Sequence, residues 1–164
     1  MARGQNPGNG HFLRLPETSQ GDSSFVNSPS TPGNSSATSI LHANPPSITP
    51  AVALDQDGRD SLYFSSVHVG SQKKTFNVIM DTGSSNFWIP SGTCRTVACR
   101  LHKTLSSSDS STLQVSGVAW DIEYGTGDAL GITGEDSVTL GGLTISRMAF
   151  GLATQISSEF IDIV

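Results

Sequence analysis

Apolar and polar residues alternate along most of the chain after residue 60, which is the pattern of strands that bury one face. His68 falls on the polar side of this alternation, so we expect it to face solvent. Many apolar positions are β-branched or aromatic, and these residue types favour strands. No segment has the spacing of a convincing amphipathic helix. The pattern predicts an all-β fold with strands over residues 62–69, 75–80, 87–89, 118–124, 129–140 and 143–152.

Glycine-rich or polar segments separate these predicted strands. Residues 70–72 and 125–128 predict tight turns between consecutive strands, and residues 141–142 turn the chain again. Residues 105–113 are polar and predict a longer turn. Gly131 and Gly134 interrupt a predicted strand, where glycine indicates a bend or a bulge.

The N-terminal segment has a different composition. Residues 1–50 are rich in Ser, Pro, Asn, Gly and Thr and show no apolar periodicity. Such a segment cannot bury enough apolar surface to offset the entropy lost on ordering. We therefore expect a disordered segment over residues 1–50 and an ordered domain over residues 51–164. Asn34 begins a glycosylation sequon, which matters only if the chain enters the secretory pathway.

One carboxylate stands out because of what surrounds it. An apolar run over residues 78–80 leads into Asp81, and the small residues Thr82, Gly83 and Ser84 follow. A charge at the end of a buried strand needs hydrogen bonds. The Gly83 amide and the Ser84 hydroxyl could supply them and would lower the pKa of Asp81. A bare Asp-Thr-Gly would more simply be a turn in which Asp81 caps backbone amides.

A second acidic stretch, Asp55-Gln56-Asp57-Gly58, admits two further interpretations. It resembles the nucleophile motif of haloacid-dehalogenase-like phosphatases, with Asp55 as nucleophile and Asp57 as acid and base. However, Arg59 replaces the expected Thr, and no alternation of strands and helices follows. A calcium loop fails as well, because Asp60 stands where the turn glycine is needed and Ser66 where the bidentate Glu is needed.

Charge and hydropathy exclude several classes of function. The chain has 164 residues with 9 Lys and Arg against 14 Asp and Glu, which predicts one domain without a basic cluster for nucleic acid. No apolar run is long enough to span a membrane. The first residues lack the apolar core of a signal peptide, so either the chain is not secreted or a leader lies upstream. No residue pattern indicates an organic cofactor.

The two cysteines, Cys94 and Cys99, enclose four residues. A disulfide between them would close a small surface loop and imply an oxidising compartment. The alternatives are two free thiols or half of a metal site. Zinc takes about four ligands, and His102 is the one further candidate nearby, so we expect no metal.

Taken together, these motifs resemble the pepsin-like aspartic proteases, in the family's order, over roughly residues 62–164. Residues 81–84 are similar to the first catalytic loop, and residues 88–90 to the apolar strand that leaves it. Residues 122–127 resemble the flap, a hairpin that closes over the substrate. Fungal secreted and vacuolar members are the ones the chain most resembles. The resemblance implies a pepsin-like acid protease fold and an extracellular or vacuolar location.

The resemblance also assigns roles to individual residues. Asp81 would be one of two carboxylates that share a proton and activate a water for peptide-bond hydrolysis. Gly83 and Ser84 would hydrogen-bond Asp81, and Thr82 would lock the loop to its counterpart across the dyad. The substrate would be covered by Tyr124, in contact with Trp88, and bound by the backbone of Gly125 and Thr126. Cys94 and Cys99 would form the family's small disulfide loop.

The chain lacks the second catalytic motif of the family. No Asp-Thr-Gly or Asp-Ser-Gly follows Asp81, although the family takes its second carboxylate from a second lobe. We therefore expect only an N-terminal lobe, truncated at its C-terminal end, whose partners are a polypeptide substrate and the missing C-terminal lobe. The predicted function is an aspartic endopeptidase. The alternative is a non-catalytic peptide-binding lobe or an inactive truncated fragment.

Asp128 is a smaller departure, because small hydroxyl residues are common in the family at this position after the flap. The added negative charge predicts a mild preference for basic residues in the substrate.

Overall fold

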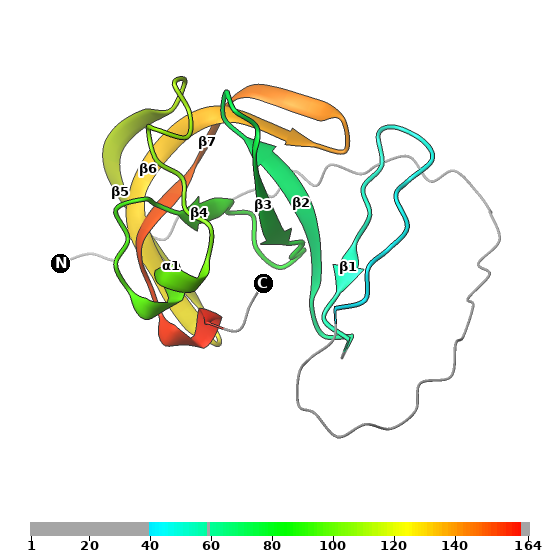
Figure 1. The fold of residues 1–164 in the computed structure, drawn as a ribbon. Coiled ribbons are helices and arrows are strands. Elements are labelled where there is room, and N and C mark those ends of the chain that lie inside the picture. The colour runs from blue at the N-terminus through cyan, green and yellow to red at the C-terminus, as the bar shows by residue number, and fades with distance from the viewer. Residues whose placement is uncertain (1–39, 59, 162–164) are drawn as a thin grey trace. The chain divides into compact units, whose positions relative to one another are not determined.

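The computed structural model describes residues 40–58 and 60–161 and contains a single twisted sheet (Figure 1). Its strands are β1 (Asp55–Gln56), β2 (Tyr63–Val69), β3 (Lys74–Ile79), β4 (Trp88–Pro90), β5 (Gln114–Tyr124), β6 (Gly127–Leu140) and β7 (Leu143–Ile156). The prediction of an all-β fold is therefore confirmed. Residues 1–39 and the sequon at Asn34 lie outside the described residues.

The sheet is built almost entirely from hairpins. Its order is β1-β2-β6-β7-β4, with β3 paired to β2 and β5 paired to β6. Every pairing is antiparallel except the parallel one between β4 and β7. Figure 1 shows β5, β6 and β7 as long curved strands that lie side by side. A doubly wound parallel sheet is absent from the described residues, which removes the phosphatase-like interpretation of Asp55 and Asp57.

The hairpin turns agree with the glycine pattern. β5 and β6 meet in a two-residue turn in which Tyr124 pairs with Gly127. β6 and β7 meet at Gly141 and Gly142, whose φ angles of 58° and 82° are left-handed, as tight hairpins require. The ladder between β6 and β7 is irregular at Gly131, where a Cβ atom would lie 2.0 Å from the carbonyl oxygen of Leu152. Glycine thus permits the bulge that the sequence indicated.

Several strands are longer than the sequence predicted. β5 begins at Gln114 rather than residue 118, and β7 continues to Ile156 rather than residue 152. These extensions mix apolar and polar residues without a clear alternation, so the hydrophobic pattern misses them, but pairing with β6 satisfies their backbone groups.

Two apolar clusters hold the sheet together. The first lies around β2, β6 and β7 and contains Val67, Val69, Phe76, Ile89, Leu105, Val138, Phe150 and Leu152. The second lies beside the cysteine loop and contains Cys94, Ala98, Cys99, Ala129, Ala153 and Ile156. β4 therefore rests on both clusters, because Ile89 is buried in the first while Trp88 packs against the second. This fixes the strand that follows the Asp81 turn.

The structure contains a short helix that the sequence pattern did not predict. The cysteine loop forms the short helix α1 (Val97–Leu101), and a 3₁₀ turn, η1 (Ser158–Phe160), follows β7. Thr96 caps α1, since its side chain accepts a hydrogen bond from the backbone N–H of Cys99. A helix of this length is too short to show apolar periodicity, and its stability comes from the cap and from packing.

Residues 40–50 fall within the predicted disordered segment but are part of the described structure. They are exposed, and Leu41 pairs with Gln56 in an isolated bridge. The carboxylate of Asp55 accepts hydrogen bonds from the backbone N–H of Ala43 and from His42. The boundary at residue 50 stays a prediction.

Candidate active site

A groove of about 550 Å³ brings five of the predicted site residues together. Asp81 and Ser84 line it from the turn after β3, Trp88 from β4, and Tyr124 and Thr126 from the β5–β6 hairpin. Asp81 is the only carboxylate among the described residues that line the groove. The wall is largely apolar and also contains Phe76, Val78, Ile79, Met80, Phe87, Ile89, Leu101, Ile156 and Phe160.

The Asp81 turn has the hydrogen bonds that the residue pattern suggested. The backbone N–H of Gly83 donates to Oδ1 of Asp81 over 2.7 Å. This bond and one from the Ser84 side chain hold the pKa of Asp81 below its ordinary value. Asp81 is therefore ionised under mildly acidic conditions, and its environment favours a proton acceptor.

The expectation that Asp81 is buried is wrong for this structure. Asp81, Thr82 and Gly83 are exposed, and only Ser84 is half-buried. The apolar run before the turn ends in Ile79 and Met80, which are themselves about 38% exposed at the groove. The turn thus presents its carboxylate to an open space, because no described element covers it.

The β5–β6 hairpin is tied to β4 by one polar contact. The indole Nε1 of Trp88 donates to the hydroxyl oxygen of Tyr124 over 2.8 Å. Both side chains are half-buried. The contact expected between these two residues is thus present, and it places the hairpin beside the groove that contains Asp81.

Phe160 joins this pair and was not singled out from the sequence. Its ring lies edge-on to Trp88, with centroids 5.9 Å apart, and to Tyr124, with centroids 5.8 Å apart. No local motif in the sequence marks it. Its position depends on η1, which turns the chain back after β7.

The tip of the hairpin is open. Gly125 and Thr126 are both exposed, and an added Cβ at Gly125 would meet no atom within 4 Å. Thr126 lines the groove, whereas Gly125, Thr82 and Gly83 do not. The tip therefore has free space around its backbone.

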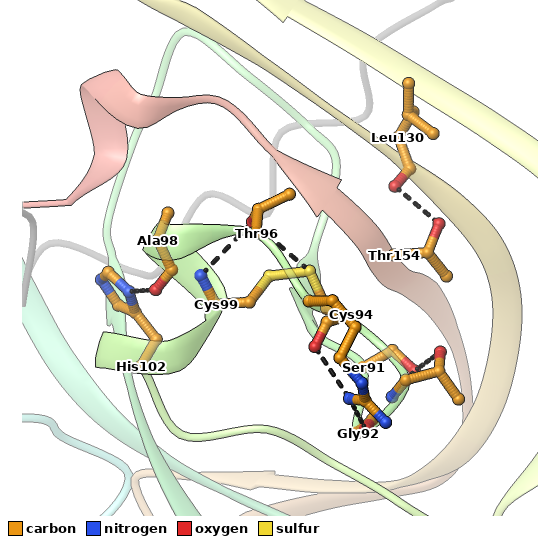
Figure 2. The surroundings of a disulfide bond; sticks show 11 residues. Ser91, Gly92, Cys94, Thr96, Ala98, Cys99, His102, Leu130 and Thr154 are labelled. Atoms are coloured by element: carbon orange, nitrogen blue, oxygen red, sulfur yellow. Dashed lines mark hydrogen bonds between the residues drawn. A yellow bond between two sulfur atoms is a disulfide. The ribbon is translucent and has the colours of Figure 1, made fainter.

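The two cysteines do not line the groove, although Leu101 at the end of α1 does. Cys94 and Cys99 form a disulfide, and both are buried. Figure 2 shows the bond beside the first turn of α1, with His102 contacting the carbonyl oxygen of Ala98. The loop packs in the same cluster as Trp88 and Phe160, so it supports the groove from behind.

Neither a metal centre nor a membrane helix emerges from residues 40–58 and 60–161. No three His, Cys, Asp or Glu side chains of this part are grouped so that they could hold a metal ion. Its helices are too short to cross a bilayer.

Comparison with known proteins identifies the family. The family model of the eukaryotic aspartyl proteases matches residues 62–164, which is more than half of the chain. The chain belongs to the eukaryotic aspartyl protease family. The matched region of this aspartyl protease chain includes the Asp81 turn, β4 and the β5–β6 hairpin.

Individual relatives agree with the family assignment. The aspartyl protease chain is 39% identical over 121 residues to the aspartic-type endopeptidase ctsD of Aspergillus fumigatus, which covers 74% of the chain and 25% of that protein. It is 45% identical over 92 residues to vacuolar protease A of Neurospora crassa, which covers 56% of the chain and 23% of that protein. It is 43% identical over 103 residues to pepsin II-2/3 of Oryctolagus cuniculus, which covers 62% of the chain and 27% of that protein. The chain thus spans about a quarter of the length of these relatives.

Proposed function

We propose that the chain is the catalytic N-terminal part of an aspartic endopeptidase. The observation that carries this proposal is the position of Asp81, hydrogen-bonded by Gly83 and Ser84 and facing the groove beside the Tyr124 hairpin. Sequence similarity to an aspartic-type endopeptidase over 74% of the chain supports the same function.

Asp81 acts as one of two carboxylates. Two carboxylates that are close together cannot both ionise cheaply, so they share one proton. The ionised member accepts a proton from the attacking water, and the protonated member donates a hydrogen bond to the scissile carbonyl oxygen. The hydrogen bonds from Gly83 and Ser84 favour the ionised form of Asp81 and so suit it to the first role.

The second carboxylate comes from a second lobe. Asp81 is the only carboxylate that the described residues place in the groove. No second Asp-Thr-Gly or Asp-Ser-Gly occurs after it in the sequence. The exposed Thr82 is available to bind the matching loop of that lobe. The chain alone is then inactive or nearly so.

The β5–β6 hairpin covers the bound peptide. Tyr124, at the end of β5 next to the turn, is held by Trp88, while Gly125 and Thr126 are exposed in the turn itself. The exposed backbone of the tip can hydrogen-bond an extended peptide, and a glycine at this position lets the hairpin open and close. Vacuolar protease A is, as its name states, a vacuolar enzyme, and together with the family resemblance this leads us to propose an extracellular or vacuolar location for this chain.

A lobe that binds peptides without cleaving them is the second candidate. The single carboxylate of the groove favours it, since one carboxylate provides only half of the acid and base pair. An apolar groove lined by aromatic residues would still hold an extended peptide.

Cleavage of a denatured protein at acid pH distinguishes the two candidates. The natural polypeptide, expressed whole, is expected to hydrolyse the substrate and to be inhibited by pepstatin. The chain of residues 1–164 alone is expected to bind pepstatin weakly and to cleave nothing. Binding of peptides by the whole polypeptide without any cleavage would support the non-catalytic lobe instead.

A further inference from the structure

The chain contains two tryptophans, and the structure places them in contact. The ring centroids of Trp88 and Trp120 are 6.2 Å apart, with their planes inclined by 35°. Trp88 lines the groove, but Trp120 does not. Trp120 can therefore influence the groove only through its neighbour.

The indole of Trp120 is fixed on two sides. Its Nε1 donates to the carbonyl oxygen of Ile132 over 2.9 Å. Its six-membered ring lies over Gly151, where a Cβ atom would come within 2.3 Å of Cε2 of the indole. The side chain thus starts on β5, crosses β6 and rests on β7, directly beside the position where Gly151 pairs with Trp88.

Trp88 is held by one hydrogen bond and by two aromatic neighbours. The only hydrogen bond that the structure gives its indole is the one to the hydroxyl of Tyr124. The ring is otherwise held by packing against Trp120 on one side and the edge of Phe160 on another. The hydrogen bond from the Trp88 indole to Tyr124 requires one orientation of the indole ring. Packing against Trp120 restricts the ring to that orientation.

We propose that Trp120 is a positioning residue for the β5–β6 hairpin. It holds the indole of Trp88 in the orientation that donates to Tyr124, and through that bond it fixes the turn end of the hairpin at the groove that contains Asp81. Trp120 and Tyr124 lie four residues apart on the same face of β5, so one strand supplies both the support and the residue that is positioned. The importance of this position for catalysis rests on the proposed function, whereas the positioning itself does not.

Fluorescence of the purified 164-residue chain tests the positioning directly. Trp120→Phe and Trp120→Leu each leave Trp88 as the sole tryptophan, and Tyr124→Phe removes the hydrogen bond while keeping the ring. With Phe at position 120, we expect Tyr124→Phe to shift the emission maximum of Trp88 and to raise its quenching by acrylamide. With Leu at position 120, the same change is expected to have no effect, because the bond is already lost.

The alternative outcomes are equally clear. An equal shift in both backgrounds would mean that Trp88 and Tyr124 stay bonded without an aromatic ring at position 120, which overturns the proposal. No shift in either background would overturn it as well. Val69→Ala in the Trp120→Phe background is the matched control, since it destabilises the core away from the tryptophans and should leave the effect of Tyr124→Phe intact.

Gly151→Ala provides a second variant that does not alter either tryptophan. The added methyl group must displace the Trp120 indole, so we expect it to shift the indole N–H resonance of Trp88, resolved from that of Trp120 by NMR, as Tyr124→Phe does. Gly134→Ala is the control, because its Cβ would meet the side chain of Leu152 at 2.7 Å and not a tryptophan. An unchanged Trp88 signal in a folded Gly151→Ala protein would contradict the proposed support.

Activity of the whole enzyme separates this inference from the proposed function. Trp120→Leu is expected to lower kcat/KM by about fivefold, equivalent to the loss of one hydrogen bond, and Trp120→Phe to recover part of it. A wild-type protein without peptidase activity would end the proposed function and leave the fluorescence result standing. An active enzyme in which Trp120→Leu shifts Trp88 but leaves kcat/KM unchanged would overturn the link to the hairpin.

Discussion

The backbone N–H of Gly83 donates to Oδ1 of Asp81 over 2.7 Å, so the turn stabilises its own carboxylate from within two residues. This arrangement needs no contact from a distant element. The side chain of Ser84 adds a second hydrogen bond to Asp81. The carboxylate is therefore hydrogen-bonded although it is exposed, and these two donors lower its pKa.

Ser84→Ala is expected to raise the pKa of Asp81 toward its ordinary value, because one of the two donors to the ionised form is lost. The carboxyl carbon of Asp81, followed by NMR across acid pH, measures this shift. Since the folded-state pKa is the lower one, the stabilisation from Asp81 is present above its unfolded-state pKa. It is lost as the pH falls through the lowered value. Ser85→Ala is the control, and an unchanged Asp81 titration in Ser84→Ala would contradict the assignment.

Gly125→Ala is expected to leave the free energy of unfolding within about 0.5 kcal/mol of the wild type, because a Cβ there meets no other atom. Gly142→Ala is the matched comparison. Its φ of 82° is left-handed, so alanine should cost about 1 kcal/mol. Urea unfolding of both variants measures the difference. If the tip of the hairpin contacts substrate, Gly125→Ala should also lower kcat/KM in the whole enzyme despite its normal stability.

Replacement of both Cys94 and Cys99 by alanine is expected to destabilise the fold by about 2 kcal/mol, since a disulfide across so short a loop removes only limited entropy from the unfolded chain. Both cysteines are buried in the apolar cluster against which Trp88 packs. Part of the lost stability should therefore come from weaker packing in that cluster. Thermal unfolding with and without a reductant measures the effect. The reductant should have no influence on the double variant, and an equal influence on both proteins would argue against the bond.

Asp128→Ser is expected to reduce cleavage of peptides with Lys near the scissile bond more than cleavage of matched Leu peptides. Asp128 is exposed after the tip of the hairpin and shares that surface with Asp121, Glu123 and Glu159. These charges should attract a basic side chain, and the effect should weaken as salt is added. Parallel assays of the two peptides in the whole enzyme measure the ratio of kcat/KM values. A ratio that does not change on substitution would remove the proposed preference.

The local pattern of residues was sufficient to predict much of this structure. Alternation located the strands, and the glycines at positions 141 and 142 located the turn between the two longest ones. The hydrogen bond from Gly83 to Asp81 could be expected because both residues belong to one turn. Such features depend on neighbours in sequence, which is the information that a single chain provides.

Features that depend on distant contacts were missed or were wrong. The helix α1 has too few residues for a periodic pattern, and Phe160 reaches the site only because η1 turns the chain. The contact between Trp88 and Trp120 requires that β5 and β4 lie on either side of β6 and β7, which no local pattern reveals. Burial of Asp81 was expected from its strand, but burial of a turn depends on what covers it.

Hydrolysis of a peptide at acid pH by the whole polypeptide, compared between the wild type and Asp81→Asn, tests the central claim most directly. Asparagine keeps the shape of the side chain and can still accept from Gly83, but it cannot take a proton from water. We predict that kcat falls by at least about 100-fold while the protein stays folded and still binds peptide. An Asp81→Asn enzyme that retains its wild-type kcat would contradict the account.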